Sequence, residues 1–228
     1  MLIIFDLDDT LVDTSGSIQE YHLRAALQAM IQQGLQVDSE EKAFQQLKAV
    51  DAQSPNGKET FRLFLTQSKQ DNPQLFEIAN TIYYAPLPED NTLPIPTLPD
   101  AHHILTSLAK SHRLCIISTG NSKLQYHKLQ QAQIPLSLFA KIIILNEYNK
   151  KEAYSHLLKE CTISPSQTIV CGDKVSTDLL PAKELGCHTI HISWGRGKVT
   201  LPKPLEVDYS ISFLKELLPL IAEIQCKL

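Results

Sequence analysis

Five short apolar segments are the feature of this sequence that most restricts its possible folds. Each has four to six residues rich in Ile or Val, without strict alternation of apolar and polar positions, as is typical of strands buried on both faces of a parallel sheet. Helical patterns separate the last four segments, and this alternation predicts βαβ units. The predicted strands are LIIF (2–5), LCIIS (114–118), KIIIL (141–145), TIVCG (168–172) and HTIHIS (188–193).

The spacing of the predicted strands is uneven. From the second strand onward they recur about every 25 residues, as in an ordinary βα repeat, but more than a hundred residues separate the first strand from the second. That interval contains helical patterns, with Gly34 as a predicted helix end and Ser39 as a predicted helix start. The helical patterns cover residues 17–34, 39–50, 58–69 and 73–85, and a proline-rich stretch follows at 85–100.

This arrangement predicts an α/β protein with two domains. The core, residues 1–14 and 93–228, is expected to be a doubly wound, Rossmann-like parallel sheet. A smaller α-helical domain, residues 15–92, is expected to be inserted immediately after the first strand. A weaker strand pattern at 207–211 and a helical pattern at 213–225 are expected to complete the core.

Composition and charge argue against several classes of partner. The hydrophobic fraction of 43% is typical of a globular chain, and a formal net charge of −4 disfavours broad binding to nucleic acids or anionic membranes. The apolar start has no basic leader and is interrupted by Asp6, and LLPLIAEI near the end is too short to span a bilayer. The five cysteines form no C-x-x-C pair. We therefore expect a cytoplasmic protein with reduced thiols and with neither nucleic-acid nor membrane partners.

Polar residues gather where the predicted strands end. In an open α/β sheet, ligands bind at the carboxyl ends of the strands. Residues from distant parts of the chain are therefore expected to meet at one edge of the sheet. The candidates are Asp6 and Asp8 after the first strand, Ser118, Thr119 and Gly120 after the second, Lys150 and Lys151 after the third, and Asp173 and Asp178 after the fourth.

The acids in this group predict a divalent cation. Clustered carboxylates repel one another, and a buried unpaired carboxylate is costly. Asp6 closes the first strand, and Asp8 can point back to the same pocket from the turn. One of these carboxylates could bind a cation or attack a substrate while the other handles a proton. The segment GDKVSTD (172–178) adds two acids, and Mg²⁺ needs only two or three carboxylates because it commonly retains several waters.

The segment STGNS (118–122) predicts an anion site on the opposite side. It offers a hydroxyl and successive backbone N–H groups at the amino end of a helix, which is a favourable place for a phosphate. A lysine at the start of the helix near residue 150 adds positive charge. A phosphoryl group would fit between this side and the acids with their cation.

The combined motifs resemble those of the haloacid-dehalogenase superfamily, and most of all its phosphatases. The matching segments are DLDDT (6–10), CIIST (115–119), a lysine near 150, and GDKVSTD (172–178), in that order. They span almost the whole predicted core. The predicted helical insertion also lies where that family places one type of cap domain.

The resemblance implies a role for each candidate residue. Asp6 would be the nucleophile that forms an aspartyl-phosphate, and Asp8 would be the general acid and base. Mg²⁺ would be held by Asp6, the main-chain carbonyl of Asp8 and Asp173, with Asp178 in or just behind that shell. The residues assigned to phosphate are Ser118, Thr119, Gly120, a lysine that is either Lys150 or Lys151, and Thr10, which we expect to orient the loop by hydrogen bonding.

Several alternatives remain open at this stage. The segment NKKEAY leaves Lys150 and Lys151 in competition, with the spacing slightly in favour of Lys150, and either Ser118 or Thr119 could supply the hydroxyl. The resemblance implies phosphate-ester chemistry and not dehalogenation, because the family's dehalogenases usually lack an acid at the position of Asp8. The predicted function is Mg²⁺-dependent hydrolysis of a small phosphorylated metabolite. The alternatives are a phosphosugar mutase and a non-catalytic module that binds a phospholigand or a protein. The sequence predicts neither the particular substrate nor the oligomeric state.

Overall fold

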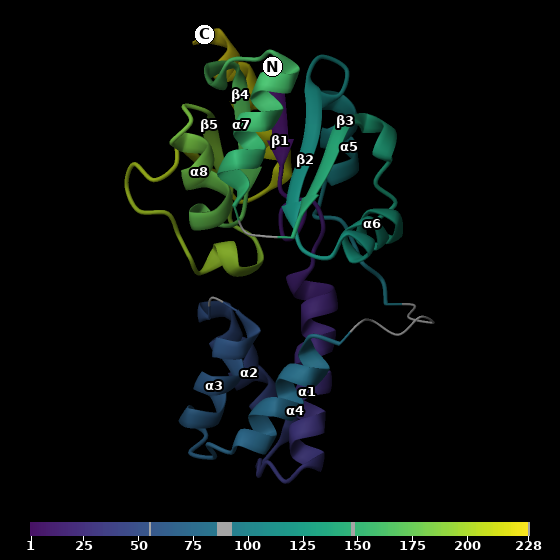
Figure 1. Ribbon diagram of the computed structural model, residues 1–228, viewed down its shortest axis with the longest axis vertical. Helices are drawn as coiled ribbons and strands as arrows, with labels where there is room; N and C mark the ends of the chain where they lie inside the picture. Colours follow the sequence, from purple (N-terminus) through teal and green to yellow (C-terminus); the bar gives the residue numbers. More distant parts are fainter. Residues whose placement is uncertain (55, 86–92, 147–148, 228) are drawn as a thin grey trace. The chain divides into compact units, whose positions relative to one another are not determined.

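The computed structural model describes all residues of 1–228 except 55, 86–92, 147–148 and 228. The chain forms two compact units (Figure 1). The first consists of Met1–Thr14 and Pro94–Leu228, and the second of Ser15–Leu93. Part of the proline-rich stretch, residues 86–92, lies outside the described residues.

The first unit is built on a parallel sheet whose strands run in the order β3-β2-β1-β4-β5-β6. The first strand is central, and the chain adds β2 and β3 on one side of it before crossing to β4 on the other. This confirms the doubly wound parallel sheet, and it places the reversal of strand order between β1 and β4. The strands are β1 Leu2–Phe5, β2 Arg113–Thr119, β3 Phe139–Leu145, β4 Thr168–Gly172, β5 His188–Ile192 and β6 Tyr209–Ile211.

Helices cover both faces of this sheet. Figure 1 shows α7 and α8 in front of the strands and α5 behind β3. Leu2 and Ile4 of β1 pack in one buried cluster with Tyr154 of α7 and Ala182 of α8. Because strand side chains alternate between faces, Asp6 points toward the same side of the sheet as Leu2 and Ile4. The helices of this unit are α5 Ala101–Leu108, α6 Ser122–Gln131, α7 Lys150–Cys161, α8 Leu180–Lys183 and α9 Leu217–Cys226.

The chain leaves β1 through a tight loop that is paired with the returning segment. The carbonyl oxygen of Leu7 accepts the N–H groups of Leu11 and Val12 at 3.0 and 3.1 Å. Leu98 then donates its N–H to the Leu11 carbonyl at 2.9 Å, and Asp13 donates to the carbonyl of residue 96 at 2.9 Å. The two ends of the inserted segment are therefore held side by side within the sheet unit.

The second unit is a group of four helices around its own apolar core. Predicted helix ends are confirmed here, because Ser39 caps α2 by accepting from the Lys42 N–H, and Gly34 follows α1 with a φ of +103°. The core includes Leu27, Phe44 and Phe61, all fully buried. The helices are α1 Glu20–Gln32, α2 Glu40–Gln53, α3 Gly57–Gln67 and α4 Pro73–Tyr83, and a π-helical turn, Ser15–Gln19, precedes α1.

Two predicted helices of the sheet unit are less regular than their sequence patterns suggest. The pattern at 176–186 forms a π-helical turn, Val175–Leu179, followed by the short α8. Pro181 has no N–H to donate, so a continuous α-helical ladder cannot run through it. The pattern at 213–225 begins as a 3₁₀ turn, Leu214–Glu216, before α9.

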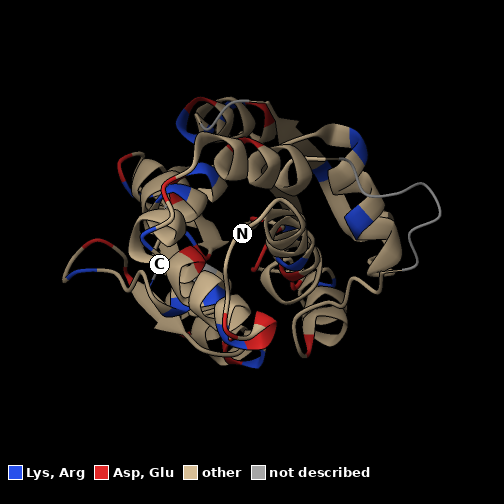
Figure 2. Ribbon diagram, turned by 90° about the horizontal axis from the view of Figure 1, so that it is seen from below, with Lys and Arg blue, Asp and Glu red and all other residues tan. Residues whose placement is uncertain are grey.

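Across the described residues, no helix combines the length and apolar character that crossing a membrane requires. Basic and acidic positions are interspersed along the helices and loops (Figure 2). The distribution agrees with the small net charge of −4.

The short edge strand β6 depends on Asp208, the residue before it. Its carboxylate accepts the N–H and the hydroxyl of Thr189 in β5 at 2.8 and 2.9 Å, and the ammonium of Lys183 in α8 at 2.9 Å. Partial burial would raise the pKa of Asp208, but the hydrogen bonds from Lys183 and Thr189 lower it below its ordinary value. These contacts explain why the weak pattern at 207–211 forms a strand.

We expect Asp208→Ala to lower the free energy of unfolding by about 1–2 kcal/mol at pH 7. Because the folded-state pKa lies below the unfolded value of about 3.9, the stabilisation is complete above that value and is lost as the pH falls through the folded pKa. The difference between wild type and variant should therefore shrink in acid. Urea unfolding followed by the fluorescence of Trp194, the single tryptophan, measures it in the sheet unit.

The control is Glu223→Ala, which removes an exposed ion pair with Lys227 on α9. That change should lower the free energy of unfolding much less than Asp208→Ala does, because solvent screens an exposed pair. Equal effects of the two substitutions would contradict the role given to Asp208.

Candidate active site

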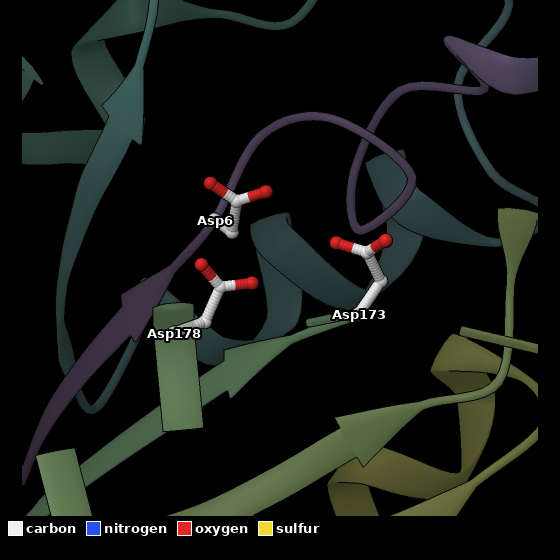
Figure 3. Close-up of side chains that lie close together, drawn as sticks. All are labelled: Asp6, Asp173 and Asp178. Atoms are coloured by element: carbon white, nitrogen blue, oxygen red, sulfur yellow. The ribbon is translucent and has the colours of Figure 1, made fainter. Parts of the chain in front are cut away.

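Three buried carboxylates meet at the carboxyl edge of the sheet, where the strand order reverses (Figure 3). Asp6 follows β1, Asp173 follows β4, and Asp178 lies on the π-helical turn after β4. One oxygen of each lies within 4.8 Å of one oxygen of the others. We call these three residues the acid group. The three have exposed fractions of 4%, 0% and 2%, so no bulk water screens their charges.

Gly172 makes this close approach possible. A Cβ atom on Gly172 would lie 2.8 Å from both Cβ and Oδ2 of Asp178, too close for any real side chain. The glycine between Cys171 and Asp173 in GDKVSTD therefore leaves space for the last acid of the same motif.

Lys150 lies between two members of the acid group. It is the first residue of α7, it is 2% exposed, and its Nζ lies 2.5 Å from Oδ1 of Asp6 and 2.8 Å from Oδ1 of Asp178. Burial alone would lower the pKa of Lys150, but the carboxylates of Asp178 and Asp6 raise it well above its ordinary value. The ammonium is therefore charged and offsets part of the negative charge.

Of the two candidate lysines, the structure does not place Lys151 at the site. Its side chain is exposed and its Nζ bonds Glu184 at 2.7 Å. Successive helical residues point about 100° apart, so only one of the pair can face the end of β1. That residue is Lys150.

Among the described residues no ammonium hydrogen-bonds to Asp173, although the nearby Lys174 ammonium acts to lower its pKa. Among the residues that the structure describes, neither oxygen of its buried carboxylate has a hydrogen-bond partner. Burial raises the pKa of Asp173 well above its ordinary range, and it also raises that of Asp6 despite the neighbouring Lys150. A buried carboxylate with free oxygens is unfavourable unless a cation binds it, and oxygen ligands are those that Mg²⁺ prefers. The acid group therefore fits a divalent cation.

The carboxylate of Asp178 is already well satisfied. Besides Lys150, it accepts the N–H of Lys174 at 3.0 Å and the hydroxyl of Thr177 at 3.2 Å. These contacts hold Asp178 in place beside Asp6 and Asp173. They are equally compatible with a direct contact to a cation and with a supporting position behind it.

Asp8 lies outside the acid group and has its own set of partners. Its Oδ1 accepts from Nζ of Lys128 and from the hydroxyl of Thr14, both at 2.5 Å, and its Oδ2 accepts from Nε2 of Gln125 at 2.8 Å. Burial would raise the pKa of Asp8, but the Lys128 ammonium and these hydrogen bonds lower it below its ordinary value. A lysine, rather than a metal alone, therefore offsets the charge of this acid.

The end of β2 brings Ser118 and Thr119 next to Asp8. Gln125 donates through Nε2 to the carbonyl of Thr119 at 2.8 Å and lies 3.3 Å from the hydroxyl of Ser118. Gly120 follows with a φ of +132° and donates its N–H to the carbonyl of Leu145 at 2.8 Å. The Gly120 amide is thus engaged within the fold, and we reassign this residue from phosphate binding to shaping the turn.

For Thr10 the structure shows a main-chain hydrogen bond to the Leu7 carbonyl at 3.4 Å, and its assignment to phosphate stays a prediction. This residue is fully buried in the loop after β1, but among the described residues its hydroxyl has no hydrogen-bond partner. The loop is held instead by main-chain hydrogen bonds to the Leu7 carbonyl.

Sequence reasoning missed Gln125, Lys128 and Thr14, which surround Asp8. The available signal was weak. The segment that forms α6 has few apolar residues for a helix that packs beside a sheet, so some of its polar residues had to be buried and paired. Nothing in the sequence indicates which ones.

A family model described as haloacid dehalogenase-like hydrolase matches residues 3–192. A glyceraldehyde 3-phosphate phosphatase of Methanocaldococcus jannaschii is 29% identical over 98% of this chain and 97% of the relative. An N-acylneuraminate-9-phosphatase of Rattus norvegicus is 23% identical over 99% of this chain and 95% of the relative. These similarities extend over both units.

Solved structures share the fold. A predicted phosphoglycolate phosphatase from Haemophilus somnus matches with a TM-score of 0.71 at 20% identity, covering 96% of this chain and 97% of that one. A subfamily IA hydrolase from Geobacter sulfurreducens matches with a TM-score of 0.67 at 17% identity, covering 96% and 95%.

We expect Mg²⁺ to raise the melting temperature of the protein, because a ligand that binds only the folded state adds stability, about 2.7 kcal/mol at a hundredfold excess over Kd. Asp173→Asn should abolish this rise. Without metal the variant should unfold at close to the wild-type temperature, because an amide of the same shape replaces a carboxylate that accepts no hydrogen bond from the described residues. Thermal unfolding with EDTA and with Mg²⁺ measures both effects.

The control is Asp38→Asn, at an exposed position of the helical unit, which should keep the full rise in melting temperature. An identical rise in the Asp173 variant would contradict the cation site.

Proposed function

Because this chain belongs to the haloacid dehalogenase-like hydrolase family, in which it is a phosphoric monoester hydrolase, we propose that Asp6 is its nucleophile and Mg²⁺ its cofactor. The observation that carries the proposal is the acid group itself, with Asp6 beside a charged lysine and with oxygens of Asp173 that accept no hydrogen bond from the described residues. Such a site suits a phosphate dianion that arrives with a divalent cation.

In the first half of the proposed reaction, an oxygen of Asp6 attacks phosphorus and the bond to the leaving alcohol breaks. Lys150 offsets charge on the phosphoryl oxygens from its position 2.5 Å from Asp6, and Ser118 donates its hydroxyl to them. Bound Mg²⁺ would supply further positive charge to the incoming phosphate. The products of this half are a phosphorylated Asp6 and the alcohol, which takes a proton from Asp8.

In the second half, water attacks the phosphorylated Asp6 and releases inorganic phosphate. Asp8 takes the proton of the attacking water, which it can accept because the Lys128 ammonium keeps its carboxylate ionised. That proton is the one that Asp8 gives to the next leaving alcohol. Asp6 acts as nucleophile and Asp8 as acid and base because their surroundings differ. Asp6 lies among other acids, whereas Asp8 is surrounded by hydrogen-bond donors.

The substrate we propose is a small sugar-type phosphate. The two kinds of relative are named for glyceraldehyde 3-phosphate and for an N-acylneuraminate 9-phosphate, both phosphate monoesters of hydroxylated compounds. The relatives named for the smaller compound have the higher identity, 29% against 23%. We also propose that the helical unit, Ser15–Leu93, acts as a cap that selects the leaving group.

Asp6→Asn should lower kcat by more than about a thousandfold, because an amide oxygen is a poor nucleophile toward phosphorus. The measurement is release of inorganic phosphate from p-nitrophenyl phosphate with Mg²⁺, together with a circular dichroism spectrum to verify folding. EDTA should silence the wild type, and added Mg²⁺ should restore it. Asp38→Asn is the matched control and should retain wild-type turnover. Substantial turnover by the Asp6 variant, or indifference to EDTA, would refute the corresponding assignment.

A panel of phosphate esters should distinguish the substrate classes. We expect kcat/KM for three-carbon sugar phosphates to exceed that for nucleotides and simple aryl phosphates by tenfold or more, because binding of the leaving group adds to transition-state stabilisation. Free phosphate as the product separates hydrolysis from a phosphosugar mutase, which would yield an isomer. A flat response across the panel with Mg²⁺ bound would favour the non-catalytic alternative.

A further inference from the structure

The helix α6 buries two polar side chains that the roles given so far do not use. Gln125 is 2% exposed and Lys128 is 5% exposed, and they lie three residues apart on the same face of the helix. Burial of an ammonium and an amide is unfavourable unless both are paired. The identity of their partners therefore indicates what this face of the helix does.

Both side chains bind the same carboxylate, one oxygen each. Nζ of Lys128 lies 2.5 Å from Oδ1 of Asp8, and Nε2 of Gln125 lies 2.8 Å from Oδ2. Two donors from one helix thereby fix the plane of the carboxylate, which a single donor could not do. Thr14 adds a third donor on Oδ1 at 2.5 Å.

Gln125 also connects Asp8 to the end of β2. Its second strong contact is with the carbonyl of Thr119 at 2.8 Å, and Ser118 lies within 3.3 Å of the same nitrogen. One amide group thus sets the distance between the carboxylate of Asp8 and the strand end that carries Ser118. Gly120 leaves room for this amide, because a Cβ there would lie only 3.3 Å from Nε2.

Lys128 balances the negative charge of the Asp8 carboxylate, which a cation bound by the acid group would not contact. The oxygens that converge to form a cation site belong to Asp6, Asp173 and Asp178, and the Asp8 carboxylate is not among them. An unpaired carboxylate near these acids would be repelled and would turn toward solvent. The ion pair with Lys128 opposes that displacement.

We propose that Gln125 and Lys128 are positioning residues that hold the carboxylate of Asp8 in register with the phosphate-binding end of β2. This inference rests on the proposed function, in which Asp8 exchanges protons with the leaving alcohol and with water. Proton transfer requires hydrogen-bond distance at the moment of reaction, and a displacement of about 1 Å can cost a hundredfold in rate. In this scheme neither residue contacts the phosphoryl group or the leaving alcohol, and each acts through the carboxylate of Asp8.

The test is a rapid-mixing experiment with Lys128→Met and Gln125→Leu, in which p-nitrophenyl phosphate is the substrate and Mg²⁺ is present. The p-nitrophenolate group departs without a proton, so phosphorylation of Asp6 should remain fast, whereas its hydrolysis still needs Asp8 as base. Each variant should therefore release one equivalent of p-nitrophenolate per enzyme in a burst, followed by steady turnover about tenfold to a hundredfold slower than wild type. Because KM would fall together with kcat when the second step becomes limiting, kcat/KM should change less than threefold.

The controls are Lys123→Met and Gln130→Leu, which make the same changes at exposed positions of α6 and should leave the kinetics unchanged. A merely structural role for Gln125 or Lys128 would lower the burst amplitude and kcat/KM in proportion to the loss of folded enzyme. That result, or wild-type turnover without a burst, would overturn the inference. Asp8→Asn distinguishes failure of the proposed function from failure of the positioning role. If it keeps wild-type turnover, the proposed function fails. If it is slow while the α6 variants are not, the positioning role alone fails.

Discussion

The compensation of buried negative charge at one edge of the sheet is the constraint on which the structure depends. Several carboxylates, among them Asp6, Asp8, Asp173 and Asp178, lie at or near the ends of β1 and β4, and a cluster of this kind is unfavourable unless cations arrive from elsewhere in the chain. Lys150 meets Asp6 across 144 positions of the sequence, and Lys128 meets Asp8 across 120. The two lysines belong to α7 and α6, so the same ion pairs that balance the charge also fasten these helices to the sheet. Asp173 has the Lys174 ammonium as a neighbouring charge, but among the described residues its oxygens accept no hydrogen bond.

Much of the fold could be predicted from the sequence because it is encoded in local patterns. Five apolar segments gave the main strands within about two residues at each end, and the acids that follow them meet as the rule for open α/β sheets requires. The boundaries of the helical insertion followed from where the strand pattern is interrupted. Ser39 and Gly34 marked helix ends for the same reason, since capping chemistry involves only neighbouring residues.

What could not be predicted depends on side-chain direction and on distant contacts. The sequence left Lys150 and Lys151 nearly equivalent, and only the phase of α7 against the sheet selects between them. The sequence pattern does not distinguish Gln125 and Lys128 from other polar residues of α6, because their partner Asp8 is distant in the sequence. Gly120 was assigned to a ligand because its motif neighbours were, whereas its N–H is required by Leu145 on the adjacent strand.

The pairing of the segments that leave and re-enter the sheet unit has an evolutionary consequence. Leu11, Val12 and Asp13 run antiparallel to residues 96–98, so the whole of Ser15–Leu93 emerges from what amounts to a single point of attachment. A module joined in this way can be exchanged, enlarged or reduced by recombination without disturbing the strand register beneath it. Diversification of such enzymes toward new metabolites can then proceed in one module while the chemistry in the other is inherited intact.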